Sequence, residues 1–359
     1  MDYRITAEER AAYKLCRRQW DFSSPHRQNL EPVEPPAAAV SAALRAALAV
    51  YYFPGMWDWS SQIVLPLVRQ AFIRAVAGQP PSAERSLNFD LGTALLERYL
   101  AWAPSLDDFG PVRVETEVEA MVPDADAPDR GLCTPDGCAV LYLDTVELLA
   151  IDAHDELWVV SHRVVDAWSD PRTLLLDERA VAACWAWEQC YLGMGVAGTI
   201  HTELLASPAG GLGSPPSATA TGRPGRGGYP QHEGSGGGRG VGVPERASAV
   251  AARLTDPERT TVHTSGPVRR THIRRGRAEI EQAGLRVATE ARELLDPALS
   301  IYPSPGRHCL RCVFDAPCVA LDEGADPALD LVARYRAREA SRPARLGSGG
   351  RGGLLPPAP

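Results

Sequence analysis

Lysine is almost absent from this 359-residue chain, because Lys14 is its only lysine and arginine supplies nearly all of the positive charge. No Gly-Lys pair occurs anywhere, so the sequence has no phosphate-binding loop of the G-x4-G-K-[ST] type. Any nucleotide-driven motor would therefore have to belong to a partner. The scarcity of lysine also limits hydrolytic mechanisms that need a lysine beside the attacking water.

Long apolar runs are missing as well. No stretch approaches the roughly 20 residues that a membrane span requires, and the start, Met1-Asp2-Tyr3-Arg4, lacks the basic-then-apolar layout of a secretory signal. We therefore expect a cytoplasmic protein without a membrane partner, whose eight cysteines stay reduced, with a disulfide between Cys133 and Cys138 as the alternative. The formal charge of -8 argues against binding nucleic acid by bulk electrostatics, although local basic patches remain available.

The composition, 45% hydrophobic and 23% charged, is that of an ordinary globular chain with one large or two smaller domains. Apolar residues recur at helical spacing in 7–20, 37–52, 60–76 and 83–102, which predicts a helical region over 1–110. Alternation from residue 111 predicts a sheet core over 111–205, with strands near 112–117, 140–151, 157–165 and 198–205 and a helix over 177–193. The fold class is therefore mixed, with both helices and a sheet.

The remaining sequence divides into three segments. Residues 206–245 are dominated by glycine and proline and are predicted to form a flexible insertion. Residues 246–325 should contain helices near 245–254 and 277–295, a strand near 268–273 and a cysteine-rich region. Residues 326–359 are rich in arginine, glycine and proline near their end and are predicted to be a flexible tail.

Four of the cysteines have the spacing of a soft-metal site. Cys309, Cys312 and Cys318 form a C-x2-C-x5-C run, and Cys16 lies near the other end of the chain. Thiolates at such spacing suit zinc or an iron-sulfur cluster, and spacing alone does not choose between them. His308 adjoins Cys309 but is redundant once four cysteines are available. A shared metal would join the two ends of the fold.

This arrangement resembles the PD-(D/E)XK nuclease superfamily, specifically its RecB/AddB-like branch with a C-terminal iron-sulfur motif. The matching segments are LCRRQW (15–20), the hairpin 146–165, the helix 183–192 and YPSPGRHCLRCVFDAPC (302–318). The resemblance implies a restriction-endonuclease-like core, a mixed central sheet flanked by helices, with a helical N-terminal region and a C-terminal cysteine region. It also implies that Cys16, Cys309, Cys312 and Cys318 hold a [4Fe-4S] cluster, with zinc as the alternative.

The same resemblance assigns a hydrolytic site, and here the sequence departs from the family. Carboxylates of such nucleases hold Mg²⁺ or Mn²⁺, and Glu147 falls at the place of the first acid, with Asp144 as a weaker substitute. The next strand should read acid, any residue, lysine, but it reads Ser161-His162-Arg163. An arginine keeps the positive charge but is a poor proton acceptor. The resemblance therefore predicts a degenerate site.

An altered but working enzyme remains the alternative. Its catalytic residues would be Glu147, Asp144, Glu115 and Arg163. A structural ion pair between Glu147 and Arg163 across the hairpin would instead be what remains of a dead site. Glu115 is also consistent with a solvated strand face. A zinc-stabilised binding module is a further alternative.

Two arginine pairs are candidates for phosphate contacts. Arg269, Arg270, Arg274 and Arg275 place four cations within seven residues, although a solvated basic surface explains them equally well. The family acts on DNA in repair and recombination, often within helicase-nuclease assemblies. The resemblance therefore implies DNA as a ligand and a helicase or another protein as a partner.

Overall fold

The computed structural model describes residues 2–33, 40–79, 85–124, 126–127, 130–206, 259–327, 331 and 333–338. It divides into two compact units. The sheet unit comprises Met1–Ala11 and Ala37–Leu299, and the cysteine unit comprises Ala12–Pro36 and Ser300–Pro359. Both units are therefore built from segments that lie far apart in the sequence.

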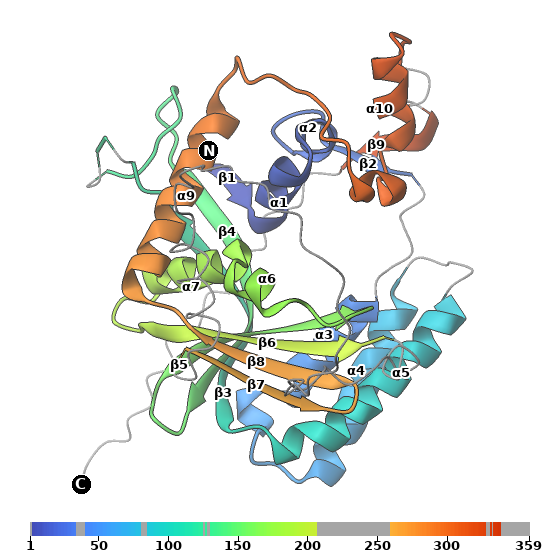
Figure 1. Cartoon of the computed structure of the whole chain (residues 1–359), viewed down its shortest axis with the longest axis vertical. Coiled ribbons are helices and arrows are strands. Elements are labelled where there is room, and N and C mark those ends of the chain that lie inside the picture. Colours follow the sequence, from blue (N-terminus) through green and yellow to red (C-terminus); the bar gives the residue numbers. More distant parts are fainter. Residues whose placement is uncertain are drawn as a thin grey trace, which may run out of the picture. The chain divides into compact units, whose positions relative to one another are not determined.

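The sheet unit contains a seven-stranded mixed sheet in which the strands follow the order β1-β4-β5-β6-β8-β7, while β3 pairs with β4 (Figure 1). β1 runs parallel to β4 and β5 parallel to β6, and the other pairs are antiparallel. The strands are β1 (Tyr3–Thr6), β3 (Phe109–Met121), β4 (Val140–Asp152), β5 (Leu157–Val165), β6 (Val196–Leu205), β7 (Thr260–Ser265) and β8 (Val268–Arg274).

Helices cover both faces of this sheet (Figure 1). The helices α3 (Val40–Tyr51), α4 (Ser61–Ala77) and α5 (Arg85–Trp102) pack with residues of β4, β5, β6 and β8 in one large apolar core. The opposite face carries α7 (Glu178–Cys190) and α9 (Arg277–Leu295), which pack on each other, while the short α6 (Pro171–Leu175) precedes α7. Amphipathic spacing explains the orientation of α4, whose buried residues recur every four positions: Val64, Val68, Phe72 and Val76.

The cysteine unit has a small core of its own. Phe22, Phe314 and Tyr335 are buried and stacked in series, with ring centroids 5.3 and 5.2 Å apart. Its elements are α2 (Arg17–Ser23), β2 (Leu30–Pro32), the 3-10 helix η4 (Arg307–Arg311), α10 (Asp315–Asp322) and β9 (Tyr335–Ala337). β2 and β9 form an antiparallel pair. α1 (Ala7–Leu15) begins in the sheet unit and ends in the cysteine unit.

These elements confirm a mixed fold with a central mixed sheet flanked by helices. Three details differ from the sequence analysis. The helix expected over 7–20 is interrupted at Cys16, whose backbone is extended at φ -161° and ψ 116°. The sequence does not predict β1, β2, β7 or α6. β9 lies within the segment predicted to be a tail. The helix near 245–254 and nearly all of the 206–245 insertion lie outside the described residues.

Candidate functional site

Glu147 lies on β4, and its carboxylate is held by the neighbouring strand. The backbone N–H of His162 donates to one carboxylate oxygen at 3.2 Å, and the His162 ring Nδ1 lies 2.8 Å from the other. The side chain of Glu147 is 16% exposed and that of His162 is 4% exposed. The first acid of the family pattern is therefore engaged by a buried histidine.

His162 continues this contact into the core. Its Nε2 lies 3.0 Å from the hydroxyl of Tyr99, which lies 2.6 Å from the hydroxyl of Tyr52. The Tyr52 hydroxyl in turn donates to Asp107, at 3.0 and 3.1 Å from its two oxygens. Burial raises the pKa of both tyrosines, so they remain neutral hydrogen-bonding groups.

Arg270 on β8 contacts Asp107 and both tyrosines of this network. Its guanidinium lies 2.9 Å from Asp107 and between the rings of Trp102 and Phe109, at 4.8 and 4.9 Å from their centroids. Burial raises the pKa of Asp107, and the Arg270 charge acts in the opposite direction. Arg270 is 1% exposed, so its charge is compensated entirely inside the protein.

Arg163 has a different partner from the one expected. Its guanidinium lies 2.5 Å from Asp177, the residue that also caps the start of α7 by accepting from the Ala180 N–H at 3.1 Å. Burial alone would raise the pKa of Asp177, but Arg163 and this N–H lower it overall. The predicted pair between Glu147 and Arg163 is therefore wrong, because Glu147 contacts His162, the residue before Arg163 on β5, and Arg163 contacts Asp177.

Ser161 is the residue at which the sequence resemblance leads one to expect a carboxylate. Its hydroxyl lies 3.5 Å from Nδ1 of His201 on β6, while His201 Nε2 lies 3.1 Å from the Thr199 hydroxyl. Burial lowers the pKa of His201 to about 3, so its ring is neutral at ordinary pH. The second acid position is thus occupied by a neutral hydroxyl and imidazole pair.

The two remaining acids are placed apart from each other. Asp144 is buried and accepts from the Thr145 N–H at 2.8 Å and from Arg179 at 3.1 Å, and burial raises its pKa. Glu115 lies 3.5 Å from Arg45, and its backbone has φ 44°, an unusual value for a residue other than glycine. Burial, with a contribution from the charge of Glu147, raises the pKa of Glu115. Glu115 and Glu147 therefore share a neighbourhood, whereas Asp144 pairs with α7.

Within the described ranges, no group of three or more His, Cys, Asp or Glu side chains is arranged so that it could hold a metal ion. The acidic residues at the positions expected for hydrolysis therefore do not form a set of ligands already converged on one point. The carboxylates that the family would use are instead satisfied by His162, Arg179 and Arg45.

The four arginines proposed for phosphate contacts all have acidic partners. Arg269 contacts Glu203, Arg274 lies 2.9 Å from Glu156, and Arg275 lies 2.7 Å from Glu279. Arg270 and Arg275 are 1% and 4% exposed. Of the four, only Arg274 has a side chain as much as 45% exposed, so phosphate contacts by this group would depend on that residue.

All four cysteines of the proposed cluster belong to the cysteine unit. Backbone N–H groups of Ser304 and Gly306 donate to the sulfurs of Cys16 and Cys309, each at 3.4 Å. Arg18 donates to the sulfur of Cys318 at 3.7 Å. Donors of this kind stabilise thiolate ligands, because they place positive charge at the sulfur.

Cys312 interacts electrostatically with the other three cysteines. Burial raises its pKa, and the neighbouring charges of Cys16, Cys318 and Cys309 contribute in the same direction. Metal coordination reverses this effect by deprotonating the thiols. The chemistry of the four donors therefore fits a cluster, although the thiols are not already arranged as a ligand group.

The network from Glu147 to Arg270 was not predicted. The sequence contains one signal for it, the histidine His162 among the apolar residues of its strand. Tyr52, Tyr99 and Asp107 come from other elements, so no local pattern connects them to His162.

Compared with models of known protein families and with curated proteins, the chain gives no match. Among the described residues, no helix combines the length and apolar character needed to cross a membrane.

Proposed function

We propose that this chain is a DNA-processing protein of the PD-(D/E)XK type whose hydrolytic site is degenerate and whose cysteine unit binds a [4Fe-4S] cluster. Its role is to hold DNA or a partner rather than to cut. The proposal depends on the resemblance of the sequence segments quoted above. The mixed sheet flanked by helices is compatible with it.

One observation carries the proposal that the site is degenerate. Each residue at a hydrolytic position is engaged by a neighbouring side chain: Glu147 by His162, Ser161 by His201 and Arg163 by Asp177. A nuclease of this type needs two carboxylates free to hold a hard dication and a group that activates water. The side chains at these positions supply one carboxylate, already paired, and no proton acceptor equivalent to lysine.

The cluster would be held by Cys16, Cys309, Cys312 and Cys318. When bound, it supplies cross-links between the segment around α2 and the segment from η4 to α10, both in the cysteine unit. The protein itself contributes the N–H donors from Ser304 and Gly306 and the Arg18 guanidinium at the sulfurs. Zinc on the same thiolates would produce the binding-module alternative.

The test is an end-labelled nuclease assay on single- and double-stranded DNA with Mn²⁺ and Mg²⁺, accompanied by a gel shift. The proposal expects binding without cleavage. The assay includes a Ser161→Asp/Arg163→Lys variant, which restores the family's acid and lysine. Cleavage by the unmodified chain that is lost in Glu147→Ala would contradict the proposal and favour the working enzyme.

A further inference from the structure

Arginines of both units pair with acidic side chains. In the sheet unit these include the four candidates on and just after β8, and in the cysteine unit Arg18 lies 2.7 Å from Asp322 and Arg336 lies 2.8 Å from Glu31. A chain with a net charge of -8 attracts phosphate only where cations are left without acidic partners. Two arginines on η4, in the cysteine unit, meet this condition.

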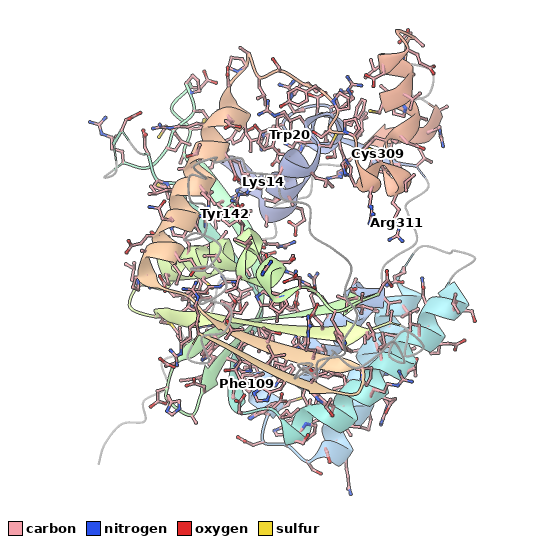
Figure 2. All side chains as sticks on the ribbon, in the orientation of Figure 1. Lys14, Trp20, Phe109, Tyr142, Cys309 and Arg311 are labelled. Atoms are coloured by element: carbon pink, nitrogen blue, oxygen red, sulfur yellow. The ribbon has the colours of Figure 1, made fainter. Side chains whose placement is uncertain are left out.

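Arg307 and Arg311 occupy the two ends of η4, and both are exposed. In the part of the chain that the structure describes, neither guanidinium has a carboxylate within ion-pair distance. Figure 2 shows the Arg311 side chain projecting from the turn that carries Cys309. Leu310 between them is 89% exposed, so the turn presents two cations around an apolar side chain.

An aromatic ring lies in the segment that leads to this turn. Tyr302 is 48% exposed, and the Arg17 guanidinium lies 5.0 Å from its ring centroid. The backbone carbonyl of Tyr302 accepts from the N–H of Arg18 at 3.2 Å, which fixes the segment to α2. An exposed ring combined with cations is the composition that binds single-stranded nucleic acid, since bases stack on the ring and phosphates meet the cations.

The segment from Tyr302 to Arg311 contains two arginines and no aspartate or glutamate. Asp322, further along the chain, lies 2.7 Å from Arg18. The segment itself therefore carries a net positive charge.

From this we infer that Tyr302, Arg307 and Arg311 form a surface that binds the backbone and bases of single-stranded DNA. This inference rests on the proposed DNA-binding function and names where the binding occurs. Ser304 and Gly306 lie within the same segment and donate to the sulfurs of Cys16 and Cys309. A cluster held by these cysteines would therefore fix the segment that binds DNA.

The test measures binding of a fluorescent dT12 oligonucleotide over a range of salt concentrations. Each phosphate contact contributes about 0.7 to the slope of log K against log salt for a single strand, so Arg307→Ala/Arg311→Ala should reduce the slope by about 1.4. The control Arg69→Ala/Arg277→Ala removes two arginines paired with Glu97 and Glu188 and should leave the slope unchanged. Arg307→Lys/Arg311→Lys should retain the original slope.

A second variant separates stacking from charge. Tyr302→Ala should weaken binding by roughly tenfold at every salt concentration without changing the slope, because stacking on an aromatic ring is largely independent of salt. Failure of the unmodified protein to bind dT12, with double-stranded DNA still bound in the gel shift, would overturn this inference alone, whereas failure to bind either DNA would also overturn DNA as the ligand in the proposed function. Normal binding with an unchanged slope in Arg307→Ala/Arg311→Ala would overturn the inference alone.

Discussion

In the sheet unit, Arg163, Arg269, Arg270, Arg274 and Arg275 each contact an acidic side chain, whereas in the cysteine unit Arg307 and Arg311 are exposed beside a cysteine. The cysteines show a parallel difference. Cys184 of the sheet unit is 0% exposed, and burial raises its pKa to about 12, whereas Cys16 and Cys309 receive N–H donors at their sulfurs. These arginines and Cys184 of the sheet unit thus serve packing and charge pairing, whereas Arg307, Arg311, Cys16 and Cys309 of the cysteine unit are available for ligands.

The largest expected effect separates the two kinds of cysteine. Cys16→Ala should remove one ligand of the cluster and destabilise the cysteine unit by several kcal/mol, because the free energy of metal binding contributes directly to folding. Cys184→Ala removes only a small buried group and should cost roughly 1 kcal/mol. Thermal unfolding of anaerobically prepared proteins measures both. Equal losses of stability in the two variants would contradict the assignment of Cys16 as a cluster ligand and Cys184 as a packing residue.

The next effect tests the buried charge network. Arg270→Met leaves Asp107 buried without its cation and should lower the free energy of unfolding by about 3 to 5 kcal/mol. Arg274 lies on the same strand, β8, and forms an exposed pair with Glu156. Arg274→Met should therefore cost at most about 1 kcal/mol. Urea unfolding of the two variants provides the comparison. A small loss for Arg270→Met would show that the network contributes little to stability.

A pH titration of stability tests the neutral state of His201. Its pKa lies at about 3 in the folded protein and is ordinary in the unfolded chain, so the unfolded state binds more protons below pH about 6.5. Its contribution to stability is present above that pH and is lost as the pH falls toward about 3, at up to about 1.4 kcal/mol per pH unit. His201→Gln should flatten the curve by this amount. An unchanged slope would show that His201 is protonated in the fold.

The smallest effect concerns Arg163. Its side chain is 43% exposed, so Arg163→Gln should cost at most about 1 kcal/mol of stability and leave DNA affinity unchanged. Measuring the nuclease activity of the same variant also tests the altered but working enzyme. Any nuclease activity that disappears with Arg163→Gln would place this residue in a working site.

Much of the secondary structure could be predicted, because periodicity is local. The strands near 140–151 and 157–165 correspond to β4 and β5, and the predicted helix over 277–295 is α9. β1 could not be predicted, because a four-residue strand carries too little alternation and depends on pairing with β4 far along the chain. β2 and β9 are three residues each and have the same limitation.

The sequence predicts which residues lie at the candidate site more readily than which side chains they contact. The hairpin placed Glu147 near β5, but the sequence could not show whether Arg163 or the adjacent His162 would face it. Successive strand residues point to opposite faces, so this choice decides which helix each side chain meets. The burial of Arg270 depends on Asp107, Tyr52 and Tyr99, which come from segments distant in the sequence.

The most direct test of the central claim is the iron and acid-labile sulfide content of the anaerobically purified chain, recorded with its absorption spectrum. A bound [4Fe-4S] cluster would make the protein brown, with about four iron ions and four sulfide ions per chain, and both should be lost in Cys312→Ala. One zinc per chain without iron or sulfide would contradict the iron-sulfur assignment and favour a zinc-stabilised module.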